Sequence, residues 1–486
     1  MKRLKKLLHR FPYFVVIFSL LSTIFINNNQ YSVKAEPTDT WPSYPSIYAE
    51  AGILIEASTG AILYDKGCHE KMYPASITKI LTTLIALEEG NLSDMVEFSH
   101  YDVYSLESGA AHISRQEGEL LSLKDCLYAV MLASANEVSN AVGAYVARQT
   151  TQYTEKIAEL DASGETYDEG KVAISVFADI MNERAKEAGA LDSNFVNPNG
   201  LFDENHYTTC YDMAMITREA IKNDEFLKIE SNTSYVIPAT NKNVETHPIS
   251  NRHKMLFPLN AVYYEGILGG KTGYVDQSGN TLVTFAKRNG MTLISVVMKS
   301  NSSNVYNDTK TLLDYGFNNF SLSNISETET KFSFDNSLGS SYLNNVFDSE
   351  TTLIKLSEDG NIVLPKGVTI DQCRSELTFN DTENSDIFAH IKYYYNDVSV
   401  GGTDLLLKSE ENEFSFGPSK VTQSEPTKKS DKYININIWV LLGIIIILIL
   451  IIAVIYYSRF IQNFSRSRRH KRRRNRYRKK NHFRRR

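Results

Sequence analysis

The stretch Pro74-Ala75-Ser76-Ile77-Thr78-Lys79 decides the fold, because it places a serine hydroxyl and a lysine amine three positions apart. Apolar residues follow at the i, i+3, i+4 spacing of a buried helix stripe, with a predicted stop at Gly90. Ser76 and Lys79 should therefore share one face of a first helical turn, where backbone N–H groups are free. A serine with a base beside it and free donors nearby is typical of a nucleophile. Ser-x-x-Lys also occurs by chance, so its meaning depends on the rest of the chain.

The charges are divided sharply along the 486 residues. Residues 1–35 and 459–486 together hold 21 of the 52 Lys and Arg residues and no Asp or Glu, so all 57 acidic residues lie between them. An acidic body between two basic ends is typical of a membrane protein rather than of a nucleic-acid-binding protein. The length predicts two or three domains.

The N-terminal residues 1–35 are predicted to be a secretory signal. A basic start precedes the apolar stretch 11–26, and the small residues of Val33-Lys34-Ala35 suit cleavage before Glu36. The alternative is an uncleaved anchor helix. Either interpretation predicts that the acidic body is exported.

Near the C-terminus, residues 438–457 are predicted to be a transmembrane helix. They are apolar or interfacial throughout and would extend about 30 Å, the thickness of the hydrocarbon layer. The basic residues 458–486 follow at once, and the positive-inside rule predicts a cytoplasmic tail and an extracellular body. The alternative for this tail, a nucleic-acid-binding patch, explains the adjoining span less well.

The body divides by composition into residues 45–321, predicted to be an α/β catalytic domain, and residues 322–416, predicted to be a small all-β domain. Residues 417–437 form a Pro/Ser/Lys-rich linker, and residues 149–171 read as an exposed insertion. A hairpin turn is predicted at Asn289-Gly290. Strands are predicted at 52–56, 61–64, 269–274, 281–287 and 291–298, and helices at 121–147 with a break at Ser134, 172–188, 209–221 and 309–317.

The four cysteines lie far apart, and no Cys-x-x-Cys pair occurs. This spacing argues against a metal-binding ribbon, and Cys126, within an apolar helical run, is predicted to be buried. We predict neither a metal nor a cofactor.

Two further triplets complete a set with Ser76 and Lys79. Ser134-Ala135-Asn136 lies about sixty residues downstream in a helical region, and Lys271-Thr272-Gly273 lies on a predicted strand. Each is weak alone, but the three in this order form the set found in penicillin-binding proteins and class A β-lactamases. The sequence resembles the low-molecular-weight penicillin-binding proteins, the serine-type D-alanyl-D-alanine carboxypeptidases. The matching stretches also include Glu56-Ala57-Ser58-Thr59-Gly60 and Phe195-Val196-Asn197-Pro198-Asn199-Gly200-Leu201.

The resemblance covers residues 45–320, and more loosely continues to 416. It implies the penicillin-binding/β-lactamase-like transpeptidase fold, an antiparallel sheet with packed helices, followed by the small β domain. It also implies a hydrolase that removes terminal D-Ala from peptidoglycan stem peptides at the cell wall, with β-lactam antibiotics as inhibitors.

The resemblance assigns roles to particular residues. Ser76 would be the nucleophile and Lys79 its base, kept neutral by burial and by a second cation, Lys271. Ser134 would pass a proton to the leaving amine, and Asn136 would hold Lys79. Lys271 and Thr272 would face the terminal carboxylate of the substrate, and Gly273 completes this triplet. The backbone N–H groups of Ser76 and Tyr274 would form the oxyanion hole.

The sequence also departs from its relatives. They often carry an arginine before the closing helix, where this chain reads Asn304-Val305-Tyr306-Asn307-Asp308. The partner of the substrate carboxylate is therefore open between Lys271, Thr272 and an unassigned group. No Glu-x-x-Leu-Asn stretch, which class A β-lactamases use for deacylation, was found. His206 and the cluster 197–201 are assigned to the scaffold.

Three hypotheses follow from these residues. The first is a membrane-anchored D,D-carboxypeptidase that acts outside the cell. The second keeps the fold but makes the protein a β-lactamase or a D,D-endopeptidase. The third is a non-catalytic wall-binding scaffold, in which the insertion and the β domain would hold partners.

Overall fold

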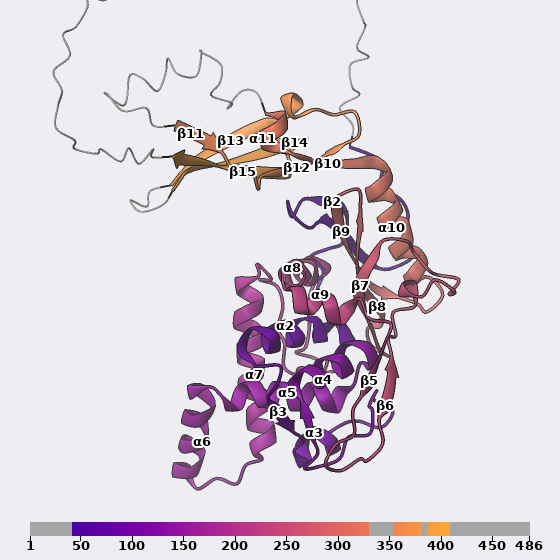
Figure 1. The fold of residues 1–486 in the computed structure, drawn as a ribbon, viewed down its shortest axis with the longest axis vertical. Helices are drawn as coiled ribbons and strands as arrows, with labels where there is room; N and C mark the ends of the chain where they lie inside the picture. Colours follow the sequence, from indigo (N-terminus) through magenta and orange to yellow (C-terminus); the bar gives the residue numbers. More distant parts are fainter. Residues whose placement is uncertain (1–40, 330–352, 381–385, 409–486) are drawn as a thin grey trace, which may run out of the picture. The chain divides into compact units, whose positions relative to one another are not determined.

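A five-stranded antiparallel sheet forms the centre of the first domain (Figure 1). The computed structural model describes residues 41–329, 353–380 and 386–408. The strand order is β2-β1-β9-β8-β7, so β7 is an edge strand. The bounds of these strands are β1 (Ala51–Glu56), β2 (Ile62–Lys66), β7 (Ile267–Val275), β8 (Gly279–Arg288) and β9 (Met291–Ser300). All five strands lie where the sequence predicts them.

Helices cover both faces of this sheet. The inner strand β1 is buried throughout, with Ile53 and Ile55 in one apolar cluster and Leu54 in another. This alternation follows from the period of two along a strand. Helix α8 (Cys210–Ala220) packs on one face, and α10 (Val305–Asn319) packs on the other. The predicted helices at 209–221 and 309–317 are thereby confirmed.

A helical subdomain adjoins the sheet through α2 (Lys79–Glu89), whose apolar stripe is buried as predicted. Ser76 itself does not lie in that α-helix. It belongs to a short 3-10 turn, η1 (Ala75–Thr78), which precedes α2. Gly90 ends α2, but in an extended conformation (φ −109°) rather than a left-handed one. The neighbouring helices are α3 (His100–Tyr104), α4 (Leu123–Tyr128), the π-turn η2 (Ala129–Ala133), α5 (Asn136–Arg148), α7 (Glu169–Glu187) and α9 (Asp224–Glu230).

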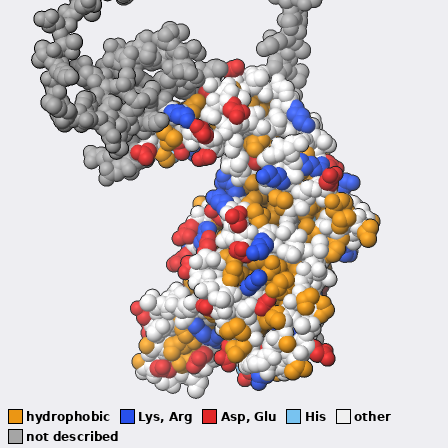
Figure 2. All heavy atoms as spheres, in the orientation of Figure 1, with side chains coloured by type: hydrophobic (Ala, Val, Ile, Leu, Met, Phe, Trp, Pro, Cys, Tyr) orange, Lys and Arg blue, Asp and Glu red, His pale blue; other side chains and the backbone are white. Residues whose placement is uncertain are grey.

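The segment predicted to be an insertion is exposed and mostly helical. Helix α6 (Thr151–Ser163) has no buried residue, and it packs beside α7 (Figure 1). Figure 2 shows charged side chains of both signs over this hairpin. Two small antiparallel two-stranded sheets complete the domain: β3 (Met95–Glu97) with β4 (Leu120–Ser122), and β5 (Ser234–Ile237) with β6 (His247–Ser250).

The second domain is a β-sheet with its own apolar core. Its first strand begins directly after α10, so this sheet starts at Phe320, close to the predicted boundary. The order is β10-β12-β15-β14-β13, with β11 paired to β15. The bounds are β10 (Phe320–Asn324), β11 (Leu353–Leu356), β12 (Asn361–Pro365), β13 (Arg374–Phe379), β14 (Ile387–Tyr395) and β15 (Val398–Lys408), with the short helix α11 (Ile325–Thr328).

Several predicted segments lie outside the described residues. They are the signal at 1–35, the linker at 417–437, the transmembrane helix at 438–457 and the basic tail at 458–486. Within the three described ranges, none of the helices has the length and apolar character needed to cross a bilayer.

Candidate active site

Ser76 is held between the edge strand β7 and the start of α2. The preceding residue, Ala75, has a left-handed backbone (φ +52°), a strained conformation for a residue with a side chain. The hydroxyl of Thr281 on β8 donates to the carbonyl of Pro74 at 2.8 Å, which ties this turn to the sheet. A Cβ atom on Gly273 would lie 2.9 Å from the backbone nitrogen of Ser76, so β7 and the turn are in close contact.

Lys79 is fully buried, and its amine reaches three oxygen atoms. Its Nζ lies 3.0 Å from Ser76 Oγ and 2.7 Å from Asn136 Oδ1. The third oxygen, the carbonyl of Asn199, lies 2.5 Å away. Burial is the first cause that lowers the pKa of Lys79 well below its usual value, and the charges of Lys271 and Arg252 lower it further. These surroundings favour the neutral amine.

The three contacts of a neutral Lys79 have a fixed direction. A neutral amine has two N–H groups and one lone pair, whereas the oxygens of Asn136 and Asn199 can only accept. Those two acceptors take both N–H groups, which turns the lone pair toward the hydroxyl of Ser76. Lys79 can therefore receive the Ser76 proton as a general base.

Ser134 lies across the cleft from Ser76, at the break between two helical segments. The π-turn η2 ends there, and Ser134 has a left-handed backbone (φ +61°) before α5 begins at Asn136. This break was predicted from the sequence. The conformation turns the Ser134 hydroxyl to Lys271, whose Nζ donates to it at 3.0 Å.

The Lys-Thr-Gly triplet lies on β7, where Lys271 is buried and Thr272 is partly exposed. Because β7 pairs only with β8 in its sheet, its outer edge carries backbone N–H and C=O groups that a peptide can use. Tyr274 is 60% exposed, and its hydroxyl donates to Asp276 at 2.8 Å. Among the predicted site residues, Tyr274 is the exposed one, while Ser76 and Thr272 are partly exposed.

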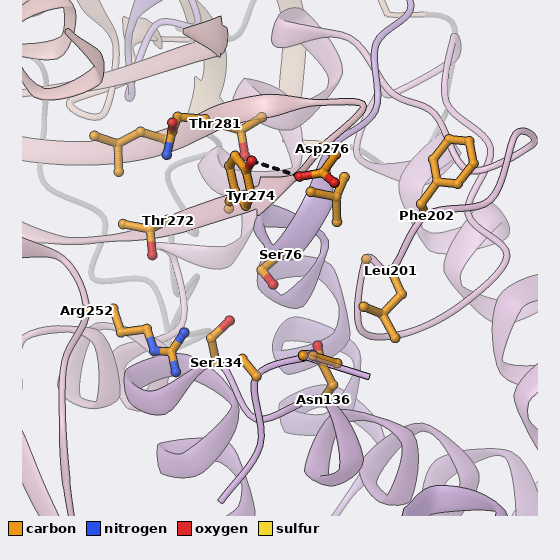
Figure 3. Close-up of a pocket in the computed structure, with 18 of the residues that line it drawn as sticks. Ser76, Ser134, Asn136, Leu201, Phe202, Arg252, Thr272, Tyr274, Asp276 and Thr281 are labelled. Atoms are coloured by element: carbon orange, nitrogen blue, oxygen red, sulfur yellow. Dashed lines mark hydrogen bonds between the residues drawn. The ribbon is translucent and has the colours of Figure 1, made fainter. Parts of the chain in front are cut away.

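All eight predicted site residues gather around one cleft of about 600 Å³. Figure 3 shows Ser76 at its centre, with Ser134 and Asn136 on one wall and Thr272 and Tyr274 on the other. The cleft walls therefore come from β7 on one side and from the start of α5 on the other.

A cation that sequence reasoning missed lies at one end of this cleft. Arg252 follows β6, and its backbone N–H donates to the carbonyl of Leu132 at 3.2 Å. Its guanidinium lines the cleft near Thr272 and Ser134 (Figure 3). Among the described residues, no carboxylate forms a salt bridge with it. Arg252 precedes α10 by more than fifty residues in the sequence, and its proximity to Lys271 arises only from the tertiary fold.

The cluster at 197–201 does more than support the scaffold. The carbonyl of Asn199 contacts Lys79, as described above, and the carbonyl of Pro198 accepts from Thr82 at 2.7 Å. The earlier assignment to the scaffold alone was therefore incomplete. The turn signal of Asn-Pro-Asn-Gly was clear in the sequence, but a backbone carbonyl leaves no residue-type signal.

His206 is a structural residue, as predicted. It is buried, its Nε2 lies 2.9 Å from Thr78 Oγ1, and its Nδ1 accepts from the Val196 N–H at 3.1 Å. Burial lowers the pKa of His206 to about 3, so the ring is neutral. Its two ring nitrogens thus join Val196, which immediately precedes the cluster at 197–201, to the turn at Ser76.

A serine hydroxyl that faces a buried lysine, beside a second serine–lysine pair, defines a serine peptidase that uses lysine as its base. The D-alanyl-D-alanine carboxypeptidase family profile, peptidase S11, matches residues 38–160 and 173–302. The chain belongs to this family. The gap in the match, residues 161–172, overlaps the C-terminal half of the predicted insertion at 149–171.

Known proteins agree with this assignment. The chain is 29% identical to D-alanyl-D-alanine carboxypeptidase DacF of Bacillus subtilis over 56% of its own length and 63% of the relative's. It is 26% identical to DacC of Escherichia coli over 76% and 86% of the two lengths. Penicillin-binding protein 5 of Haemophilus influenzae has the same fold, with a TM-score of 0.55 and 23% identity over 75% of this chain and 98% of that one.

Proposed function

We propose that this protein is a serine D,D-carboxypeptidase that removes the terminal D-Ala from peptidoglycan stem peptides. The observation that carries the proposal is the amine of Lys79, which two carbonyl acceptors orient so that its lone pair faces Ser76. The family match gives the reaction class.

In the first half of the reaction, Ser76 Oγ attacks the carbonyl carbon of the terminal peptide bond and its proton passes to Lys79. The backbone N–H groups of Ser76 and Tyr274 stabilise the oxyanion. Ser134 gives its proton to the leaving amine of D-Ala and receives in its place the proton that Lys79 took from Ser76, so Lys79 is neutral again, while Lys271 stays charged and donates to the Ser134 hydroxyl at 3.0 Å. Breaking the C–N bond leaves an acyl-enzyme at Ser76.

In the second half, water attacks the acyl carbon and gives its proton to the neutral Lys79; the ester bond to Ser76 then breaks, and Lys79 returns that proton to Ser76 Oγ. A β-lactam would acylate the same serine, but its leaving amine stays attached through the ring. The product of that reaction is a long-lived adduct, which supplies a direct assay of Ser76.

The test is labelling of the purified full-length chain with a fluorescent penicillin, together with D-Ala release from a pentapeptide that ends in D-Ala-D-Ala. The wild type should form a stable adduct and release D-Ala, and Ser76→Ala should do neither. Ser93→Ala, at an exposed serine outside the cleft, is the matched control. A wild type that neither labels nor releases D-Ala would refute the proposal, and rapid turnover of penicillin would identify a β-lactamase.

We further propose that Arg252 binds the substrate's terminal carboxylate. Its guanidinium lines the cleft and has no salt-bridge partner among the described residues. Thr272 lies beside it (Figure 3), so the two groups can bind one carboxylate together. Arg252 would thus bind the carboxylate in place of the arginine that relatives often carry before the closing helix and that this chain lacks before α10.

Arg252→Gln should lower kcat/KM for the free-acid pentapeptide by about 10- to 100-fold, because a hydrogen bond to a charged group contributes about 1.5–3 kcal/mol. The same variant should change cleavage of the C-terminal amide of that peptide little. Lys242→Gln, at an exposed lysine, serves as the control for loss of one positive charge. Equal losses for acid and amide substrates would contradict carboxylate binding by Arg252.

The last part of the proposal concerns the cellular localisation of the chain. We propose that the chain is exported and anchored by residues 438–457, with residues 458–486 in the cytoplasm and the active site outside. The apolar span and the 15 basic residues from 459 onward support it. In cell fractionation the full chain should sediment with membranes, and a chain that ends at residue 416 should not. Recovery of the full chain in the soluble fraction would contradict the anchor.

A further inference from the structure

A buried carboxylate lies directly behind the Lys-Thr-Gly strand. Glu230 is the last residue of α9 and has no exposed surface. Its Oε2 accepts the N–H of Gly270 at 2.7 Å, and its Oε1 has no hydrogen-bond partner among the described residues. A buried carboxylate with one oxygen unpaired is costly unless a positive charge compensates it.

Gly269 allows this close approach. A Cβ atom on Gly269 would lie 2.6 Å from the Cβ of Glu230, so a larger residue there would push α9 away from β7. A Cβ atom on Gly270 would instead lie 2.2 Å from the carbonyl oxygen of Val283 and 2.8 Å from the His253 ring. Gly269 thus makes room for Glu230 behind the strand, and Gly270 allows β7 to pack closely against β8 and His253.

The groups around Lys271 are mainly cationic. Lys79 and Arg252 are both close enough for their charges to interact with it. His253 is also buried, and burial lowers the pKa of His253 to about 3, so it adds no charge. The charge of Glu137, on α5, raises the pKa of Lys79 instead. Glu230 is the described carboxylate whose charge acts on Lys271 itself.

We propose that Glu230 is a positioning residue that acts through Lys271: it holds the backbone of β7 at Gly270 and favours the charged ammonium form of Lys271. A charged Lys271 can donate to Ser134 and attract an anionic substrate, and it also repels a proton from Lys79. Glu230 therefore supports both lysines of the site without touching the substrate. This inference rests on the proposed function, since its kinetic test measures the rate at which Ser76 is acylated.

Burial and the charge of the partner have opposite effects on the pKa of each group. Burial lowers the pKa of Lys271, and the carboxylate of Glu230 raises it again. Burial raises the pKa of Glu230, while the Gly270 N–H and Lys271 lower it. Removing the negative charge should therefore lower the pKa of Lys271, so that this lysine loses its proton at a lower pH.

Glu230→Gln separates the charge from the hydrogen bond, because an amide oxygen can still accept from Gly270. The alkaline limb of the pH profile for acylation by penicillin should move down by about one to three pH units, the usual effect of losing a close opposite charge. Glu225→Gln removes an exposed carboxylate from the same helix and should leave the profile unchanged. A purely structural role would lower the rate equally at every pH, and that result would overturn the proposal.

A second measurement does not require catalysis. Thermal unfolding of Glu230→Gln, Lys271→Gln and the double variant forms a cycle that detects their interaction. Each single variant leaves one partner buried and unpaired, so the double variant should lose less in Tm than the sum of the two single losses. Additive losses would show that the two groups do not interact. The two proposals can therefore be refuted separately. Additive Tm losses would refute the interaction of Glu230 with Lys271 even if the wild type is labelled by penicillin, and absence of labelling would refute the proposed function even if the Tm losses are not additive.

Discussion

Lys79→Met should slow acylation of Ser76 by penicillin by about 10²- to 10⁴-fold, the usual contribution of a positioned general base. The methionine can fill the buried space of Lys79 but cannot accept the Ser76 proton. The nucleophile itself remains in place, since η1 is held to the sheet by Thr281 and Pro74. Stopped-flow measurement with a fluorescent penicillin gives the acylation rate directly.

Lys79→Arg is the informative companion of that variant. It places a permanent positive charge one turn from Ser76, because a guanidinium does not give up its proton in proteins. If Lys79 acts as a base, the arginine variant should be as slow as the methionine variant. An arginine variant with near wild-type acylation would instead assign Lys79 an electrostatic role.

The wild-type pH profile offers a further test of the same assignment. Lys79 must be neutral to act as a base, so its deprotonation should set the acidic limb of the acylation rate. Because burial and the neighbouring cations lower the pKa of Lys79 well below its usual value, the rate should persist far below the ordinary pKa of lysine. In Lys271→Gln the repulsion is lost, and this acidic limb should move to higher pH.

Local patterns predicted the elements that carry the site. The strands predicted at 269–274, 281–287 and 291–298 lie in β7, β8 and β9, and Asn289-Gly290 indicated the hairpin between the last two. Both of those residues have left-handed backbones, as that type of turn requires. The ordered triplets also indicated correctly which side chains would meet at one cleft.

Groups that depend on tertiary contacts could not be predicted in the same way. Arg252 reaches the cleft from a loop after β6, and Glu230 reaches β7 from the end of a short helix. Neither has a periodic or motif signal of its own. Ser76 was expected in the first turn of an α-helix, but its turn is 3-10, because Ala75 before it takes a left-handed conformation. That strain is a property of the packed site and not of the residue types.

The second large effect concerns Gly200, whose backbone is left-handed (φ +81°). A methyl group there would lie 1.9 Å from the carbonyl oxygen of Ala75, so either the loop or the Ser76 turn would have to move. The backbone strain of alanine in this conformation costs about 1–3 kcal/mol, and the contact adds to it. Gly200→Ala should therefore lower Tm and also slow acylation about 10²-fold, since a displacement near 1 Å at the reacting groups has that effect.

Gly189→Ala is the matched control for Gly200→Ala, because it separates strain from contact. Gly189 follows α7 and is also left-handed (φ +86°). A Cβ atom added to Gly189 would have no neighbouring atom within 4 Å. Its alanine variant should therefore bear the strain alone, with a smaller loss of Tm and an unchanged acylation rate. The loop at Gly200 also carries the Asn199 carbonyl that orients Lys79, so its displacement alters the base as well as the nucleophile. If Gly200→Ala acylated at the wild-type rate, that carbonyl could not be what directs the Lys79 lone pair to Ser76.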